Sequence, residues 1–143
     1  MSRIIFATGN QNKMREIREI MQGFRVNEEK VEILSMKEAG VFADIVEDGT
    51  TFVENASIKA KAIAALAPGD FVMADDSGLE IDYLNKEPGI YSSRYMGEDT
   101  SYDIKNRILL DRLEGVPDDE RTARFVCAVA AVFPDGKELV VRG

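Results

Sequence analysis

The segment from Phe71 to Gly78 constrains the fold more than any other part of this sequence. A short apolar run of strand-forming residues, Phe71-Val72-Met73-Ala74, is followed by two carboxylates, a hydroxyl and a glycine. In open α/β sheets, ligands bind in the crevice beyond the carboxyl ends of the strands. We therefore expect a buried strand that ends in acids at such a crevice, where they are candidates for metal binding or general-base chemistry.

The two acids of this segment, Asp75 and Asp76, are adjacent in the chain. Successive residues of a strand point to opposite faces, so both cannot face one ligand if the strand continues through them. One of the two is then structural. The alternative interpretation of Asp75 to Gly78 is a solvated turn.

A second strand with polar residues after it lies at the amino terminus. Residues 3–7 are predicted to form the strand, residues 8–13 a polar glycine turn, and residues 11–22 an amphipathic helix. Free backbone N–H groups at a helix start, a close-approaching Gly9 and the charge of Lys13 suit a phosphate group. The segment is not a P-loop, and an ordinary turn with an Asn10 helix cap and an exposed lysine is the alternative.

A third polar segment opens the next helix. The pattern Thr51-x-x-Glu54 predicts a capping box, and Pro68-Gly69 predicts the helix end. Thr51, Asn55 and Lys59 recur at four-residue spacing, which predicts one polar stripe that faces a ligand or simply solvent. Glu47 precedes this helix and, with Asp75 and Asp76, is one of three acids that stand out.

The remaining segments predict further elements of an α/β fold. We expect a strand over 31–34, a loop over 37–48, a half-buried strand after Gly78, and a helix over 101–114 that begins at the capping box Thr100-x-x-Asp103. Residues 123–133 predict a central strand covered on both faces. A turn at Pro134-Asp135-Gly136 then joins it to a strand over 137–142.

Composition limits the possible functions. A chain of 143 residues with 45% apolar content can bury a core and is expected to form a single domain over 1–143. The formal charge of −8 argues against a nucleic-acid-binding surface, and the absence of histidine excludes Ser-His-Asp and Cys-His catalysis. With no membrane-length apolar run and one cysteine, Cys127, expected as a buried thiol, the prediction is a cytoplasmic protein.

Four motifs together resemble one family. They are Thr8-Gly9-Asn10-x-x-Lys13, Glu47-x-Gly49-x-Thr51-Phe52-x-Glu54-Asn55-Ala56-x-x-Lys59-Ala60, Ala74-Asp75-Asp76-Ser77-Gly78-Leu79 and Pro88-Gly89-x-Tyr91-Ser92-x-Arg94-Tyr95. In order and spacing they resemble the inosine triphosphate pyrophosphatase family, the XTP/dITP pyrophosphohydrolases. The resemblance implies a homodimeric α/β protein with an elongated mixed sheet, flanking helices and two lobes around a substrate cleft. It also implies Mg²⁺-dependent hydrolysis of ITP, dITP or XTP to the monophosphate and pyrophosphate.

The resemblance also implies roles for individual residues. Asp76 would be the general base and would hold the metal together with Glu47, while Asp75 or Glu54 would assist. The substrate-binding residues would be Thr8, Gly9, Asn10, Gln11, Asn12, Lys13, Lys59 and Ser77. The implied partners are a nucleoside triphosphate and a second copy of the chain, with no nucleic acid and no membrane.

The sequence departs from the family in one respect. Family members continue into Gly-Tyr-Asp-Pro and Ser-His-Arg motifs that help bind the purine base, and neither is present here. We therefore expect a domain that lacks its C-terminal segment. Two alternatives stay open: a non-catalytic relative that folds, dimerises and binds triphosphate without efficient turnover, and a Maf-type nucleotide pyrophosphatase, which the motifs disfavour.

Overall fold

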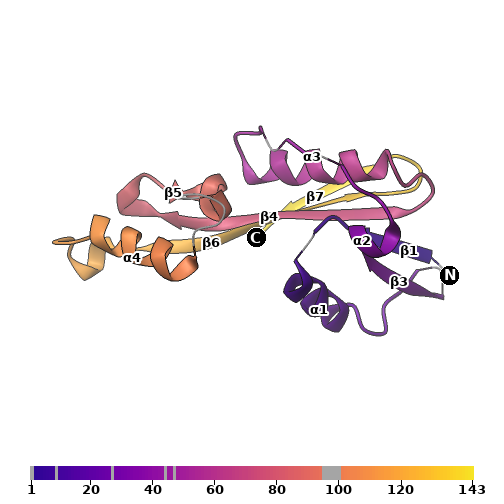
Figure 1. The fold of residues 1–143 in the computed structure, drawn as a ribbon, viewed down its shortest axis with the longest axis horizontal. Coiled ribbons are helices and arrows are strands. Elements are labelled where there is room, and N and C mark those ends of the chain that lie inside the picture. The colour runs from indigo at the N-terminus through magenta and orange to yellow at the C-terminus, as the bar shows by residue number, and fades with distance from the viewer. Residues whose placement is uncertain (1, 9, 27, 44, 47, 95–100) are drawn as a thin grey trace. The chain divides into compact units, whose positions relative to one another are not determined.

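The computed structural model describes residues 2–8, 10–26, 28–43, 45–46, 48–94 and 101–143. Its strands follow the order β2-β3-β1-β4-β6-β7, with β5 paired to β4 (Figure 1). The chain divides into two compact units. One comprises Met1–Asp76 and Ala128–Arg142, and the other comprises Ser77–Cys127 and Gly143.

The first unit is built on parallel strands. β1 (Ser2–Phe6) pairs in parallel with β3 (Glu29–Ser35) on one side and with β4 (Phe71–Ile81) on the other. A short β2 (Arg25–Val26) is antiparallel to β3, and β7 (Glu138–Arg142) is antiparallel to β6 (Ala123–Val132). The sheet is therefore mixed, as the sequence predicts.

Three helices accompany these strands. They are α1 (Gln11–Ile20), α2 (Met36–Ala39) and α3 (Phe52–Ala64). α1 and α3 lie on opposite faces of the sheet (Figure 1). Ile5, Met14, Ile63 and Val72 have no exposed surface, because each apolar face is covered by the element packed against it.

A hydrogen-bonded ion pair links α3 to β7. The Ser57 hydroxyl donates to Glu138 Oε1 at 2.7 Å, and Lys61 Nζ lies 3.1 Å from Glu138 Oε2. The bond from Ser57, helped by Lys61, lowers the pKa of the Glu138 carboxyl below its ordinary value. The carboxylate therefore stabilises the packing of this helix in its charged form.

The second unit has its own small core. Its elements are η1 (Asp82–Leu84), β5 (Glu87–Pro88), η2 (Gly89–Arg94), α4 (Tyr102–Arg112) and η3 (Asp118–Glu120), with the adjoining ends of β4 and β6. A cluster of its buried apolar residues comprises Ile81, Leu84, Leu109, Leu113 and Val116. The α4 side chains thus close a core that is separate from that of the first unit.

The structure corrects the expected end of the acidic strand. β4 runs without interruption from Phe71 to Ile81, through both aspartates, Ser77 and Gly78. The acids nevertheless lie at a boundary, because the last partner of β1 on β4 is Met73 and Ala7 N–H still donates to the Met73 carbonyl at 2.8 Å. At this point β1 ends, whereas β4 continues.

Two smaller predictions also need correction. Residues 37–39, expected in a loop, belong to α2 because Ser35 and Glu38 make a reciprocal capping box. The helix over 102–112 is capped by Ser101, whose hydroxyl accepts from Ile104 N–H, and Thr100 lies outside the described residues. Leu109 of this helix is buried, whereas Ile104 is 51% exposed.

The prediction that the strand over 123–133 is covered on both faces is right for only one face. Val126, Ala128, Ala130 and Val132, which alternate along one face, are buried, but Phe125 on the other face is 82% exposed. Cys127 lies on that second face and is exposed, so its expected burial is wrong. Apolar composition alone did not reveal which face of this strand is covered.

The α/β prediction with a mixed sheet and flanking helices is confirmed. The single-domain prediction and the substrate cleft between two lobes stay predictions. Within the described residues, the structure contains no helix with the length and hydropathy needed to cross a bilayer.

Candidate functional site

The turn from β1 into α1 is held by its own side chains. Asn10 is the N-cap, and its Oδ1 accepts from the backbone N–H groups of Asn12 at 2.9 Å and Lys13 at 3.2 Å. Thr8 is buried, and its hydroxyl oxygen accepts from Asn10 N–H at 3.1 Å. The helix cap foreseen for Asn10 is therefore present, while Gln11 and Asn12 are exposed and Gly9 lies outside the described residues.

Lys13 reaches from α1 to the sheet. Its Nζ lies 3.2 Å from Oδ2 of Asp75, and the lysine side chain is 39% exposed whereas that of the aspartate is 11% exposed. A half-buried ion pair of this kind fixes a flexible lysine in one position. Asp75 is thus the partner of the predicted phosphate-binding lysine.

Asp76 occupies the opposite face of β4. Because the strand persists through both acids, the side chains alternate, and Asp75 already faces α1. Asp76 therefore points to the face on which α3 lies (Figure 1), and the residue is only 9% exposed. The condition of the sequence expectation is met, because the strand continues through both acids and they point to opposite faces.

Side chains in the first turn of α3 accept hydrogen bonds from the loop that precedes the helix. Thr51 caps the helix by accepting from Glu54 N–H at 3.1 Å, as the capping box predicts. The Glu54 carboxylate does not accept the reciprocal hydrogen bond from the Thr51 backbone N–H. It accepts instead from the backbone N–H of Thr50 at 2.7 Å and from the Thr50 hydroxyl at 3.2 Å.

Asn55 makes the second contact to this loop. Its side chain has no exposed surface, and its Oδ1 accepts from Gly49 N–H at 2.9 Å. The expected polar stripe is thus only partly right, since Asn55 shares the buried face of α3 with Phe52 and Ala56. Together, Glu54 and Asn55 hold residues 49 and 50 against the helix.

Gly49 leaves no room for a side chain at this contact. A Cβ added there would lie 2.7 Å from Asn55 Oδ1 and 2.7 Å from Glu54 Cβ. Both distances are shorter than real Cβ contacts allow. The glycine is therefore needed for close approach of the loop to the helix.

The other predicted site residues are placed as follows. Lys59 is half-buried on α3, four residues after Asn55. Ser77 is exposed and lines a cavity of about 140 Å³ within the second unit, together with Gly78, Leu79, Ser92 and Lys105. Glu47 lies outside the described residues, two positions before Gly49.

The donor set suits a hard cation such as Mg²⁺. Asp76 supplies carboxylate oxygens from a buried position, and Mg²⁺ in proteins typically takes one or two carboxylates and keeps several waters. Among the residues that the structure describes, no group of three metal-binding side chains gathers in one place.

Two residues of this region make contacts that the sequence analysis did not predict. Asp75 orients Lys13, and Asn55 fixes the loop that follows Glu47. The sequence carries a signal for Asn55, because it lies at helical spacing from the apolar face and a buried amide needs a partner. The sequence contains no comparable signal that pairs Asp75 with Lys13, which are 62 positions apart.

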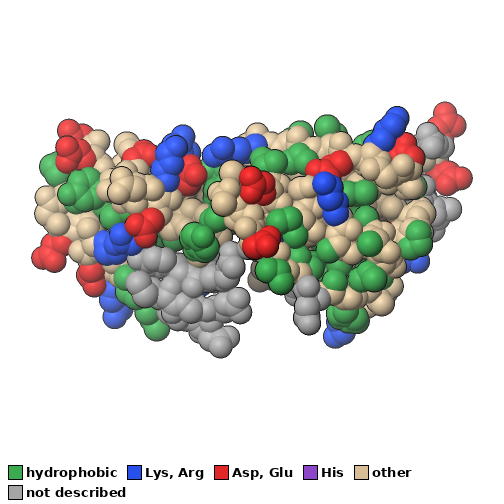
Figure 2. Space-filling view, turned by 90° about the horizontal axis from the view of Figure 1, so that it is seen from above, with side chains coloured by type: hydrophobic (Ala, Val, Ile, Leu, Met, Phe, Trp, Pro, Cys, Tyr) green, Lys and Arg blue, Asp and Glu red, His purple; other side chains and the backbone are tan. Residues whose placement is uncertain are grey.

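Charges of both signs are interspersed on the molecular surface. On the face drawn in Figure 2, Asp and Glu side chains lie among the Lys and Arg side chains. With a formal charge of −8, such a surface is poorly suited to binding a polyanion.

Comparison with known proteins gives a consistent result. Residues 4–143 match the Ham1 family. A dITP/XTP pyrophosphatase of Clostridium perfringens is 47% identical over 148 residues, which cover 100% of this chain and 70% of that protein. A dITP/XTP pyrophosphatase of Leuconostoc mesenteroides is 40% identical over 141 residues, which cover 99% of this chain and 68% of that protein.

Solved structures agree with the sequence match. A HAM1 protein from Coxiella burnetii superposes with a TM-score of 0.85 at 35% identity, over 100% of this chain and 70% of that one. The Staphylococcus aureus Ham1 protein superposes with a TM-score of 0.83 at 37% identity, over 99% of this chain and 69% of that one.

Proposed function

Because the chain belongs to the Ham1 family, we propose that it hydrolyses non-canonical purine nucleoside triphosphates, such as dITP, XTP and ITP, to the monophosphate and pyrophosphate. The observation that carries this proposal is the family match over residues 4–143. The proposed enzyme is a cytoplasmic, Mg²⁺-dependent homodimer.

Binding of the triphosphate is assigned to the cationic side of the site. Lys13, held at 3.2 Å from Asp75, offers a positioned ammonium for phosphate oxygens, and Lys59 offers a second from α3. Thr8, Gly9, Asn10, Gln11 and Asn12, at the start of α1, are assigned further contacts to the triphosphate. Ser77, which follows Asp76 in β4, is assigned a hydrogen bond to substrate.

Asp76 is assigned as the general base. A carboxylate oxygen that accepts the proton of a water at phosphorus raises the water's nucleophilicity at the moment of attack. When bound, Mg²⁺ supplies charge neutralisation on the phosphate oxygens, and Glu47 and Asp76 would hold it. Asp75 and Glu54 are less suited to the metal, since they contact Lys13 and Thr50.

The direct test is pyrophosphate release from dITP, XTP and ITP, with ATP and GTP as controls, in the presence of Mg²⁺ and after its removal with EDTA. We expect release from the first three, abolished by EDTA. Triphosphate binding without pyrophosphate release would support the non-catalytic alternative, and the absence of both would contradict the proposal.

A further inference from the structure

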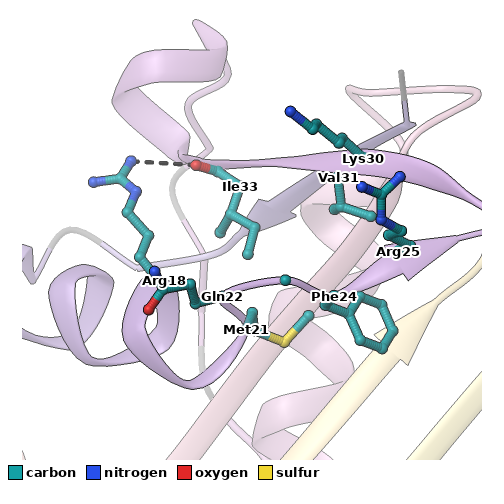
Figure 3. A pocket seen from close by; sticks show the side chains of 9 residues that line it. Arg18, Met21, Gln22, Phe24, Arg25, Lys30, Val31 and Ile33 are labelled. Carbon is teal, nitrogen blue, oxygen red and sulfur yellow. Dashed lines mark hydrogen bonds between the residues drawn. The ribbon is translucent and has the colours of Figure 1, made fainter.

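A second pocket lies in the first unit, at the end of α1 (Figure 3). We call it the α1–β3 pocket. It encloses about 320 Å³, at the lower end of the range of about 300–1,000 Å³ that small-molecule sites occupy. It is lined by Arg18, Met21, Gln22, Gly23, Phe24, Arg25, Lys30, Val31 and Ile33.

The charge of this lining differs from that of the chain. Three of the nine lining residues are cationic and none is acidic, although the chain carries a formal charge of −8. A pocket bordered by one sign of charge raises the local concentration of ligands of the opposite sign. The α1–β3 pocket is therefore suited to an anion.

Two of the cationic residues lie directly opposite each other on neighbouring strands. Arg25 of β2 and Lys30 of β3 are direct cross-strand partners, and like charges in that relation destabilise a strand pair. Arg25 Nη1 donates to the Glu28 carbonyl at 3.1 Å, and no carboxylate among the described residues pairs with Lys30. Unfavourable contacts of this kind often occur at functional sites. Here, a bound anion would offset the repulsion between Arg25 and Lys30.

The third cation has a different role. Arg18 is paired with the Glu38 carboxylate, and its Nη2 also donates to the Ile33 carbonyl at 3.2 Å. These contacts fix Arg18 across the pocket, as Figure 3 shows for the bond to Ile33. The charge available to a ligand therefore comes mainly from Arg25 and Lys30.

Apolar side chains supply the rest of the lining. Phe24 is 50% exposed, and Met21, Val31 and Ile33 are only half-buried. In Figure 3, Met21 and Phe24 border the pocket on the side of α1, and Val31 and Ile33 border it on the side of β3. An exposed aromatic ring beside cations can stack on a flat heterocycle.

We propose that the α1–β3 pocket binds a nucleoside monophosphate. Its phosphate would contact Arg25 and Lys30, where the arginine fork can donate two hydrogen bonds to one phosphate group. Its base would pack on Phe24 and the neighbouring apolar side chains. None of the pocket residues belongs to the candidate functional site, so this ligand binds apart from the triphosphate.

The test is a titration followed through backbone amide signals by NMR, with IMP, inorganic phosphate and inosine as separate probes. The choice of IMP rests on the proposed function, since it is the product of ITP hydrolysis, but the measurement needs no turnover. We expect IMP to shift the amides of residues 21–26 and 30–33. Phosphate and inosine should each shift them at least about tenfold more weakly, because each offers half of the contacts.

A double variant separates this pocket from the active site. Arg25→Gln with Lys30→Gln should weaken the IMP-dependent shifts of residues 21–26 and 30–33 at least about tenfold, and should leave any shifts around residues 8–13 unchanged. Lys37→Gln, at an exposed lysine of α2, is the matched control and should change neither set. An inactive protein that still shows the pocket shifts would refute the proposed function and leave this inference standing.

Three outcomes would overturn the proposal. The first is an absence of shifts in residues 21–26 and 30–33 at millimolar IMP. The second is equal binding by the double variant. The third is equal affinity for inorganic phosphate, which would mean that the pocket holds an anion without recognising a nucleoside.

Discussion

The starts of α1 and α3 use the same kinds of polar residue in opposite ways. At α1, the Asn10 side chain accepts from the helix's own first-turn N–H groups, and the neighbouring Gln11 and Asn12 are exposed. At α3, Asn55 is fully buried and accepts from Gly49 N–H in the preceding loop. The polar side chains at the start of α1 thus cap the helix itself, whereas those of α3 also fix the preceding loop.

The same contrast extends to the two aspartates of β4. Asp75 faces α1 and pairs with Lys13, while Asp76 faces the side of α3. A difference of one position in a strand would therefore separate the proposed substrate positioning from the proposed chemistry. The variants below test whether these two regions differ in the way their geometry indicates.

The largest effect is expected for Asp76→Asn. The change keeps the shape of the side chain and removes both the base and a metal-binding charge, so kcat for ITP should fall by about 10² or more. Asp75→Asn is the matched comparison and should lower kcat by less than about tenfold, with most of its effect on KM. A larger loss of kcat in Asp75→Asn would reverse the two assignments.

Asn55→Ala should have the next largest effect, on stability. It leaves the Gly49 N–H without its acceptor and opens space in the core, which should cost about 1–3 kcal/mol in the free energy of unfolding, measured by urea denaturation. Asn12→Ala, at an exposed position in the first turn of α1, should change stability by no more than about 0.5 kcal/mol. Equal losses would mean that the two helix starts do not differ in this way.

Lys13→Met should weaken triphosphate binding selectively. Loss of the positioned ammonium should raise the Kd for ITP about tenfold or more, with little change in the Kd for inosine, which carries no phosphate. Calorimetric titration of both ligands checks this. Parallel losses would instead indicate that the Lys13–Asp75 pair supports the fold.

The smallest effect concerns acid stability at the α3–β7 contact. The bond from Ser57 and the charge of Lys61 lower the pKa of Glu138, so its contribution is fully present above the ordinary carboxyl pKa and is lost as pH falls through the lower folded value. Glu138→Gln should therefore reduce the loss of stability between about pH 5 and pH 3. Glu16→Gln, at an exposed position of α1, is the control and should leave this acid-dependent loss of stability, the acid limb of the stability curve, unchanged.

Glu38 offers a second, independent check on this reasoning. The Ser35 backbone N–H, followed by Arg18, lowers the pKa of its carboxyl. The sign is the same as for Glu138, so Glu38→Gln should also flatten the acid limb of the stability curve. Its contact lies on α2, beside the end of α1, and should respond independently of the α3–β7 contact.

Sequence patterns determined much of this protein by local rules. The strand over 3–7, the helix from Gln11, the helix after Thr51 and the hairpin at Pro134–Gly136 all follow from periodicity, caps and turn residues. The alternation of Asp75 and Asp76 follows from strand geometry once the strand is known to continue through them. These features depend on near neighbours in the chain, which is why they can be predicted without the fold.

Only the tertiary structure decided what each polar side chain contacts. β4 continues past Gly78, and the edge at the acids exists because β1 ends beside Met73. The burial of Asn55, the Lys13–Asp75 pair and the exposure of Cys127 depend on which surfaces are brought together by residues far apart in sequence. Burial and ion pairing arise from packing across the chain, and no local pattern encodes them.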